Sequence, residues 1–240
     1  MGQESVLLFR AEEKPSDRYR QLLEKKGFRV FFCAPVRFVF RPLDRIERVL
    51  ASYARYGGLL LTSPRVIQVL KQIENERSRV LAPWKQLPVF TVGTRSADRL
   101  RALGFRTVYE GQGTAISLLP VLRDVHSGKP MLFLSGSTRR AELVRALTQE
   151  GLSFHEHVVY ESYPVHPLKL PSGSFDWFVF FSPLGVQTVY EQYPGLMGRK
   201  VAIGPTTAQE LARVDRGAVH VASRPTPEAV AEILSNQGKE

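Results

Sequence analysis

The chain has 240 residues, of which 43% are hydrophobic and 23% charged, and its net charge is +10. These proportions are typical of one large globular domain or two small ones, and no stretch approaches the ~20 apolar residues of a membrane-spanning helix. The single cysteine, Cys33, rules out an intramolecular disulfide. Together with a start that does not read as a signal peptide, it favours a cytoplasmic location.

The positive charge predicts an acidic partner, which would be nucleic acid, an anionic membrane or a small polyanion. The basic residues are scattered as singles and pairs, without a run of five or more. This spread argues against a tail that grips nucleic acid, and it leaves open a groove lined by loops.

Strands are predicted wherever a short apolar run is bounded by turn residues. In the first half of the chain these runs lie at residues 5–10, 28–34, 58–62, 88–92 and 107–109. In the second half they lie at residues 131–134, 154–159, 176–181, 200–203 and 219–221. Most are followed by a helical pattern, as in "SDRYRQLLEKKG". Alternating strands and helices indicate right-handed βαβ units and mainly parallel sheets.

The landmarks of the first half recur in the same order in the second half, which indicates a duplication. "LLLTSPRVIQVL" matches "FFSPLGVQTVY", and Gly93 in "VFTVGTRSADRL" matches Gly204 in "VAIGPTTAQELA". Each half accounts for a five-stranded, doubly wound sheet. The simplest expectation places the domain boundary at residues 124–130, "DVHSGKP", because Gly and Pro suit a linker.

Hydroxyl side chains gather at the predicted strand-to-helix turns. Ser63 and Ser182 each precede a proline and are expected first of all to cap their helices. Ligands of parallel sheets bind beyond the carboxyl ends of the strands, where helix N-termini attract anions. The whole cluster therefore predicts a cleft for carboxylates or phosphates. Its members are Ser63, Thr94, Ser96, Ser135, Ser137, Thr138, Ser182, Thr206 and Thr207.

The sequence gives little support for nucleotide binding, for a nucleophilic serine or for a zinc site. The sequence contains no GxGxxG, GxxxxGK[ST] or GxSxG motif. His155 and His157 alternate on one strand without a cysteine or carboxylate at zinc-site spacing. Cys33 and Trp177 belong to apolar runs that predict buried strands. By itself, Tyr160 is interpreted as a packing residue at a strand end.

Four stretches, "GGLLLTSPRVIQVL", "VYESYPVHP", "FVFFSPLGVQTV" and "VAIGPTTAQELA", together resemble the uroporphyrinogen-III synthase family across nearly the whole chain. The resemblance implies an α/β fold of two doubly wound, flavodoxin-like domains, each with a parallel five-stranded sheet, joined by a two-strand linker. Residues 1–36 and 164–240 would form the first domain and residues 37–163 an inserted second one. The crossings would lie near residues 36–41 and 160–166.

The resemblance also implies a reaction. Hydroxymethylbilane, a linear tetrapyrrole with eight carboxylates, would be cyclised to uroporphyrinogen III with inversion of ring D through a spiro intermediate, as part of heme biosynthesis. A polycarboxylate substrate suits a chain of charge +10. The family pattern further implies a cytoplasmic monomer without metal or organic cofactor and without nucleic-acid or membrane partners.

Roles for individual residues follow from the same resemblance. The phenol of Tyr160 would assist departure of the substrate hydroxyl. Thr207, helped by Thr206, would bind a substrate carboxylate at a helix N-terminus. The remaining candidates would line the same cleft or add charge to it; they are Ser63, Arg65, Ser96 and Ser182. Serine stands at position 96 where the family more often has threonine.

Two other functions fit parts of the sequence. A two-domain anion- or sugar-binding protein without catalysis would share the paired doubly wound sheets. A nucleic-acid-binding protein would explain the charge, but the chain lacks a recognised module and the basic–aromatic interleaving that single strands favour.

Overall fold

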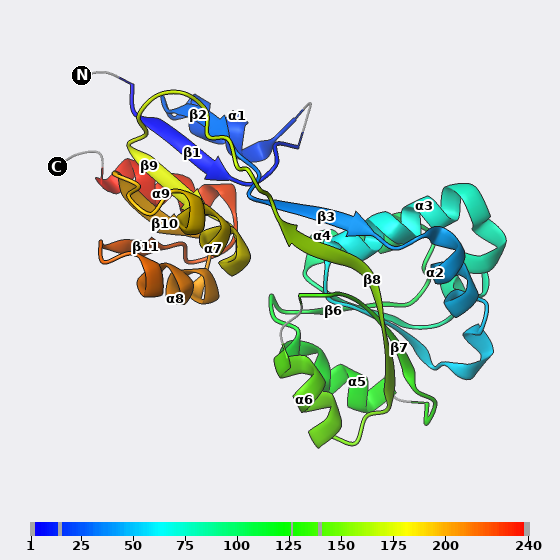
Figure 1. Ribbon diagram of the computed structural model, residues 1–240. Coiled ribbons are helices and arrows are strands. Elements are labelled where there is room, and N and C mark those ends of the chain that lie inside the picture. The colour runs from blue at the N-terminus through cyan, green and yellow to red at the C-terminus, as the bar shows by residue number, and fades with distance from the viewer. Residues whose placement is uncertain (1–2, 14–15, 126, 139–140, 238–240) are drawn as a thin grey trace. The chain divides into compact units, whose positions relative to one another are not determined.

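The structure is a computed structural model that describes residues 3–13, 16–125, 127–138 and 141–237 (Figure 1). The chain forms two compact units. Unit 1 comprises Met1–Arg37 and Tyr163–Glu240, and unit 2 comprises Phe38–Ser162. Within the described ranges, no helix is long and apolar enough to cross a membrane.

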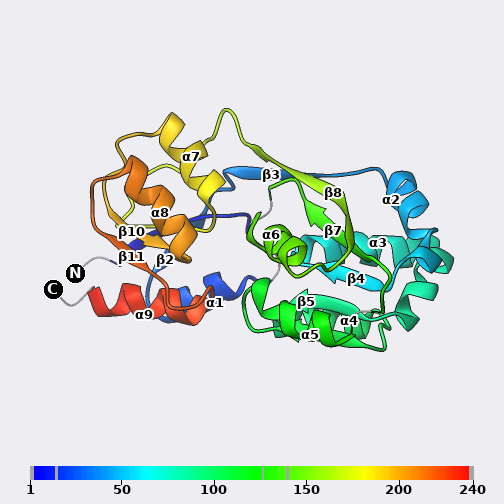
Figure 2. The ribbon, with the colours of Figure 1, turned by 90° about the horizontal axis from the view of Figure 1, so that it is seen from below.

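Unit 1 contains a parallel five-stranded sheet in the order β11-β10-β9-β1-β2. The strands are β1 (Ser5–Phe9), β2 (Arg29–Phe32), β9 (Trp177–Phe180), β10 (Arg199–Ala202) and β11 (Val219–Val221). The helices are α1 (Arg18–Lys25), α7 (Pro183–Gln192), α8 (Pro205–Val214) and α9 (Pro227–Gln237). Alternate residues of a strand point to opposite faces. Val6 and Leu8 accordingly pack with α1 and α9, and Leu7 packs with α7 and α8 on the other face (Figure 2).

Unit 2 contains a six-stranded sheet in the order β3-β8-β7-β4-β5-β6. Its strands are β3 (Val36–Phe40), β4 (Gly58–Leu61), β5 (Val89–Val92), β6 (Val108–Gly111), β7 (Met131–Gly136) and β8 (Phe154–Pro164). The α-helices are α2 (Leu43–Leu50), α3 (Pro64–Leu81), α4 (Thr94–Ala102), α5 (Leu119–Val125) and α6 (Ala141–Gln149). Short 3₁₀ turns lie at Tyr53–Arg55, Pro83–Gln86 and Ile116–Leu118. One core joins the sheet to α2, α3 and α4, and a second, containing Leu60 and Phe90, joins it to α5 and α6.

The predicted α/β class with parallel sheets is confirmed, and each of the ten predicted strands is present. The expectation of five strands is correct for unit 1 and wrong for unit 2, which has β3 as a sixth. Val165 N–H donates to Pro35 O and Arg41 N–H to Val159 O, so β3 runs antiparallel to β8. Sequence periodicity does not indicate β3, because most of its side chains are exposed and it lacks the apolar alternation of a core strand.

The expected boundary at residues 124–130 is also wrong. The described part of this segment joins α5 to β7 inside unit 2, whereas the boundary between the units falls within β3 and β8. Counting strands within each half explains the error. β1, β2, β4, β5 and β6 are strands one to five of the first copy, and β7, β8, β9, β10 and β11 are those of the second.

With that count, both sheets contain the strand order 2-1-3-4-5, and each takes two strands from one copy and three from the other. Unit 1 combines strands one and two of the first copy with strands three to five of the second. Unit 2 has the reverse combination. The midpoint of the repeat is therefore not a boundary between folded units.

A carboxylate at the start of β9 makes unit 1 sensitive to acid. Asp176 accepts hydrogen bonds from Ser5 N at 2.7 Å and from Ser5 Oγ at 2.8 Å. The Ser5 backbone donor is the main reason that the pKa of Asp176 lies below its ordinary value. A lowered carboxyl pKa stabilises the fold above the unfolded pKa of about 4, and this contribution disappears as pH falls through the folded pKa.

We expect Asp176→Asn to lower the melting temperature at pH 7 by about 2–4 °C, because losing one charge-assisted hydrogen bond at an exposed site costs on the order of 1 kcal/mol. The difference from the unaltered protein should shrink below about pH 4, where Asp176 itself becomes neutral. Thermal melts across this range measure it. A difference that stays constant with pH would contradict the assignment to the Asp176 charge.

Candidate functional site

The turn between β4 and α3 is built by a capped helix start. Ser63 is the N-cap of α3, Pro64 follows at the first helical position, and Ser63 Oγ accepts a hydrogen bond from Arg65 N at 3.2 Å. This is the capping arrangement that the sequence predicts, and it satisfies one of the helix's free N–H groups. The turn lies at the carboxyl end of β4, in the interior of the sheet.

Tyr160 meets this turn from β8. Its phenol donates a hydrogen bond to Ser63 Oγ at 3.0 Å, although the two residues are 97 positions apart in the sequence. The ring is 6% exposed and packs in the same core as α3. Gly136, the last residue of β7, pairs with Tyr160 where the register of β7 and β8 shifts. The structure thus brings two predicted site residues into direct contact.

Arg65 is the second residue of α3, two positions after Ser63. Its guanidinium carbon is 3.5 Å from the centre of the Phe38 ring, and the Phe38 ring stands edge-on to Tyr160 at 6.0 Å between centroids. A guanidinium that lies over an aromatic ring keeps its charge while its position is restricted. Arg65 therefore supplies an oriented positive charge beside Ser63 and Tyr160.

The turn between β5 and α4 is of a different kind. Gly93 is the N-cap of α4, with φ at 83°, a value that favours glycine, and no side chain caps the helix. Ser96, in the first turn of α4, is 5% exposed. The neighbouring Thr94 donates to Glu110 Oε1 at 2.9 Å. Because β5 lies beside β4, this turn is at the same sheet edge as Ser63.

Unit 1 has the same two kinds of turn. Ser182 is the N-cap of α7, with Pro183 after it, and its Oγ accepts a hydrogen bond from Gly185 N at 3.1 Å. The N-cap of α8 is Gly204, and no side chain caps that helix. Thr206 and Thr207 follow within its first turn. The two turns come after the adjacent strands β9 and β10, so they share the carboxyl edge of the unit 1 sheet.

Ser96 and Thr207 stand out among the predicted hydroxyls. Each lies three residues after a glycine N-cap, and Thr207 is only 2% exposed. Neither side chain has a hydrogen-bond partner among the described residues, whereas Ser63 and Ser182 are used as caps. A hydroxyl at a helix start whose N–H groups also lack a side-chain cap suits an anionic ligand such as a carboxylate.

Ser135 and Ser137 are hydrogen-bonded to residues of the neighbouring strand β8. Ser135 Oγ donates to Glu156 Oε1 at 2.6 Å, and Ser137 Oγ accepts from Ser162 N at 3.2 Å. Thr138 is exposed in the loop after β7. These contacts show local structural roles for the first two residues.

The histidine pair lies on a strand as predicted, whereas Cys33 is buried but follows the end of β2 instead of lying within a strand. His155 and His157 lie on one face of β8, and His155 stands edge-on to Tyr56 at 5.7 Å. Burial, with a contribution from Arg41, lowers the pKa of His157. Cys33 is buried, and burial raises the pKa of its thiol. Within the described parts of the chain, no group of three or more His, Cys, Asp or Glu side chains could hold a metal ion.

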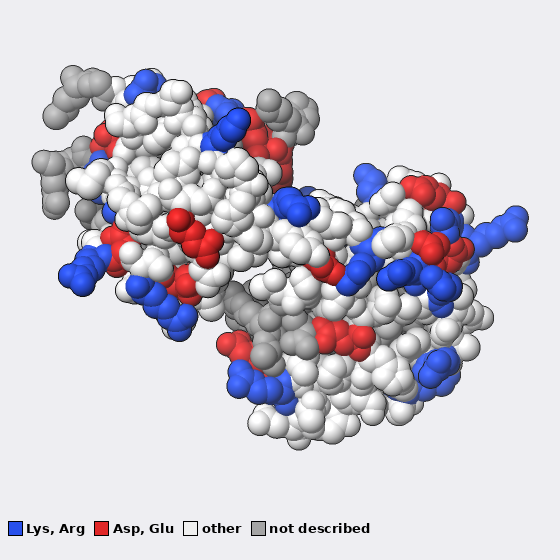
Figure 3. All heavy atoms as spheres, viewed as in Figure 1, with Lys and Arg blue, Asp and Glu red and all other residues white. Residues whose placement is uncertain are grey.

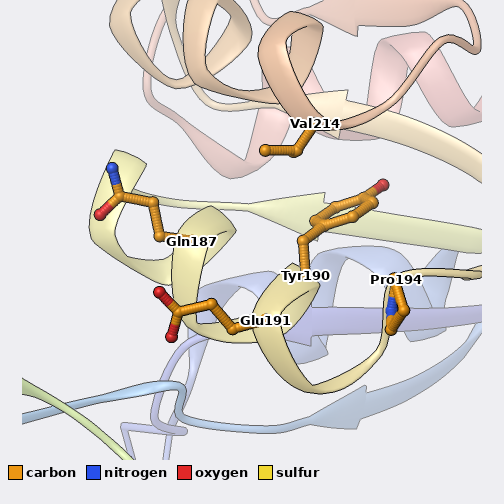
Figure 4. Close-up of a pocket in the computed structure, with 5 residues that line it drawn as sticks. All are labelled: Gln187, Tyr190, Glu191, Pro194 and Val214. Carbon is orange, nitrogen blue, oxygen red and sulfur yellow. The ribbon is translucent and has the colours of Figure 1, made fainter.

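Two hollows lie away from these turns. A cavity of about 380 Å³ in unit 1 is lined by Gln187, Tyr190, Glu191, Pro194 and Val214, and Tyr190 and Val214 face each other across it (Figure 4). Tyr190 and Glu191 lie near the end of α7 and Val214 ends α8, so these three are far along their helices from Ser182 and Thr207, whereas Gln187 is in the middle of α7 and Pro194 follows it. A cavity of about 270 Å³ in unit 2 is lined by Arg41, Arg45, His157 and Val158.

Charges of both signs are mixed on the face of the protein that Figure 3 shows. Lys and Arg are interspersed with Asp and Glu on the visible face (Figure 3). Many of the basic side chains pair with acids, as Arg20 does with both Glu12 and Glu24. On the face that Figure 3 shows, the described residues do not form a single basic stripe of the kind expected of a nucleic-acid-binding surface.

Two contributors to the site were not found from the sequence. Gly136 leaves the space in which the Tyr160 ring lies, and Phe38 separates that ring from Arg65. A glycine at the end of a strand, in "FLSGS", is the only signal for the first. Phe38 carries no signal, because its role depends on the pairing of β3 with β8.

Comparisons with known proteins agree with one another. A family model described as uroporphyrinogen-III synthase HemD matches residues 17–232. The chain is 28% identical to a uroporphyrinogen-III synthase of Schizosaccharomyces pombe, with 96% of each chain covered. It is 25% identical to that of Saccharomyces cerevisiae, over 95% of this chain and 94% of the yeast one. A solved uroporphyrinogen-III synthetase from Helicobacter pylori has the same fold, with a TM-score of 0.71 at 18% identity over 98% and 99% of the two chains.

Proposed function

This chain belongs to the uroporphyrinogen-III synthase family, and we infer that it cyclises hydroxymethylbilane to uroporphyrinogen III in heme biosynthesis. The observation that carries the inference is the family match across residues 17–232. The enzyme is a cyclising lyase, because ring closure removes one molecule of water from the substrate.

The chemistry explains what the protein must supply. Loss of the hydroxymethyl oxygen as water leaves an azafulvenium-type electrophile, which attacks the substituted carbon of the terminal pyrrole to give a spiro intermediate. Fragmentation and reclosure then invert ring D. The free bilane closes unaided to the uninverted isomer, so the enzyme has to hold the conformation that leads to the spiro route. Positioning of this kind can account for a large share of a rate enhancement.

The site assignment is our proposal for how this positioning is done. In unit 1, Thr206 and Thr207 bind a substrate carboxylate at the start of α8, and Ser182 lines the same edge. In unit 2, Ser96 and Arg65 bind carboxylates, and Ser63 and Tyr160 act on the leaving hydroxyl. The proposal is supported by the hydroxyls of two largely buried residues, Ser96 and Thr207, in helix first turns that begin at a glycine N-cap, and by the Ser63–Tyr160 hydrogen bond.

We propose that the units are two flavodoxin-like domains, residues 1–36 with 164–240 and residues 37–163, joined by a two-strand linker. The strand order 2-1-3-4-5 supports the domain type. The boundaries of the compact units, within β3 and β8, support the linker. The proposal further includes a monomeric cytoplasmic enzyme whose partner is the bilane, without a metal, an organic cofactor, nucleic acid or a membrane.

A coupled assay tests the function directly. Hydroxymethylbilane would be generated in place, trapped by the protein, and the products resolved as isomers I and III after oxidation. We expect isomer III to predominate when the protein is present and isomer I when it is absent. Binding of the bilane without a change in the isomer ratio would indicate an anion-binding protein and contradict the synthase assignment.

Salt should weaken the capture of the substrate. Exposed charges more than ~8 Å apart are screened at physiological ionic strength, so we expect KM for the bilane to rise several-fold between low and high salt. Duplex DNA should not compete. Initial rates over a salt series, with melting temperatures as the control for folding, measure this. A KM that does not respond to salt would contradict an electrostatic contribution to binding.

A further inference from the structure

We propose that Ser63, rather than Tyr160, gives its proton directly to the leaving hydroxyl of the substrate, and that Tyr160 resupplies Ser63 through their hydrogen bond. The proposal rests on the proposed function, and it changes which group meets the substrate. Under it, Ser63 is the catalytic residue and Tyr160 acts through Ser63.

The hydrogen bonds at Ser63 carry the argument. A serine hydroxyl has one proton to donate and two lone pairs that can accept. Ser63 Oγ accepts from the Tyr160 phenol at 3.0 Å and from Arg65 N at 3.2 Å, so both of its acceptor positions are used. The hydroxyl proton of Ser63 is therefore the one that remains available to a ligand. The phenolic proton of Tyr160 is already directed at Ser63.

The burial of the two side chains also favours Ser63 as the group that meets the substrate. Tyr160 is 6% exposed and surrounded by the core of unit 2, with Phe38 and Phe40 edge-on or tilted at 6.0 and 6.1 Å. Gly136 lies so close to the ring that an added Cβ would be 2.3 Å from Tyr160 Cζ. Ser63 is half-buried in the turn at the end of the sheet, where a ligand of a parallel sheet binds. A phenol enclosed in this way is suited to supply protons to its neighbour, and the serine is the exposed end of the pair.

The proton transfer balances. Ser63 Oγ–H protonates the hydroxyl oxygen of the bilane, the CH₂–O bond breaks, and its electron pair leaves with water. The pyrrole nitrogen lone pair stabilises the methylene as the azafulvenium-type cation. At the same time the phenolic proton of Tyr160 moves to Ser63 Oγ. The proton released when the rearranged macrocycle regains its aromatic pyrrole returns to Tyr160, so both hydroxyls are restored.

A double-mutant cycle in the full-length protein tests the relay. We expect Tyr160→Phe and Ser63→Ala each to lower kcat by ~10- to 100-fold with KM nearly unchanged, toward the low end of typical proton-transfer effects because the leaving group needs little help. The double variant should be no more than about 3-fold slower than the worse single variant, because two groups that act in series are lost together. Ser63→Thr keeps the hydroxyl and the cap and should restore most of kcat.

Because Ser63→Ala also removes the N-cap of α3, a second variant that removes a cap elsewhere serves as a control. Thr226 Oγ1 caps α9 by accepting from Ala229 N at 3.3 Å. Thr226→Ala and Ser63→Ala should each lower the melting temperature by ~2–4 °C, and only Ser63→Ala should lower kcat. This comparison separates the chemical role of Ser63 from its structural one.

Three outcomes would overturn the relay: losses that multiply in the double variant, a Ser63→Thr enzyme as slow as Ser63→Ala, or wild-type kcat in Tyr160→Phe. Each can occur while the unaltered protein still makes isomer III, so the relay can fail and the synthase function stand. Failure of the unaltered protein to shift the isomer ratio would instead contradict the function itself.

Discussion

Replacing Thr207 with valine is expected to lower kcat/KM for hydroxymethylbilane by about 10- to 150-fold, because a hydrogen bond to a charged group contributes roughly 1.5–3 kcal/mol. Valine has nearly the same shape as threonine, and the backbone N–H groups of α8 remain in place. Thr207 is 2% exposed and its hydroxyl has no partner among the described residues, so the substitution removes no hydrogen bond within that part of the chain. Stability should therefore change little.

Thr188→Val is the matched control for that experiment. Thr188 is 1% exposed on α7, and its hydroxyl donates to Leu184 O at 2.8 Å, away from the start of the helix. Its replacement should affect the melting temperature and leave kcat/KM unchanged. Steady-state kinetics and thermal melts of both variants test whether Thr207 binds a substrate carboxylate. Wild-type kcat/KM in Thr207→Val would mean that the carboxylate does not bind at the start of α8.

The second large effect concerns a single methyl group. Gly136→Ala should reduce kcat by about 10²-fold, because a misplacement of about 1 Å at a group that supports the reaction can have that consequence. An added Cβ would lie 2.3 Å from Tyr160 Cζ and 2.5 Å from Tyr160 Oη, so we expect the ring to move and the phenol to leave its position beside Ser63 Oγ. The melting temperature should fall as well, since inserting atoms into a packed site is destabilising.

Gly195→Ala controls for the change of residue type. A Cβ at Gly195 would meet no atom within 4 Å, and its φ is not among the positive values, so kcat and stability should be retained. Leucine at position 160 lacks the distal ring atoms that clash with the added methyl group. The double variant Gly136→Ala/Tyr160→Leu should therefore be more stable than Gly136→Ala, while its kcat should remain low. Unchanged kcat in Gly136→Ala would mean that the position of the Tyr160 ring does not matter for turnover.

The sequence predicts the elements of the fold well because the core strands are short, strongly apolar runs bounded by turn residues. β4, for example, is buried along its whole length, and its apolar run has no other structural interpretation. β3 could not be found in this way, because it lies at a sheet edge and its side chains are mostly exposed. The assignment of strands to the two sheets also could not be derived, since periodicity does not indicate which copy of a repeat supplies which strand.

In the candidate site too, the sequence indicates the contacts between neighbouring residues but not those between residues far apart in the chain. The caps at Ser63 and Ser182 depend on residues within three positions of each serine, so the sequence indicates them directly. The Tyr160–Ser63 contact depends on how β8 lies relative to β4, two strands away in the sheet. The tyrosine taken alone therefore predicts a packing residue. Its ring does lie in the core, and its hydroxyl in addition donates to Ser63 Oγ, which the local sequence does not indicate.

The sharing of strands between the two copies has a consequence for synthesis on the ribosome. β1 is an interior strand of its sheet and is buried along its whole length, but its neighbour β9 begins only at Trp177. At ~5–20 residues per second, roughly 10–30 s separate the emergence of these two strands. Unit 2 can close during that interval, since its last strand, β8, ends before β9 begins. We therefore expect the nascent chain to leave the edge of β1 unpaired, and its apolar faces uncovered, until its last third is made, so that unit 1 is the last to fold.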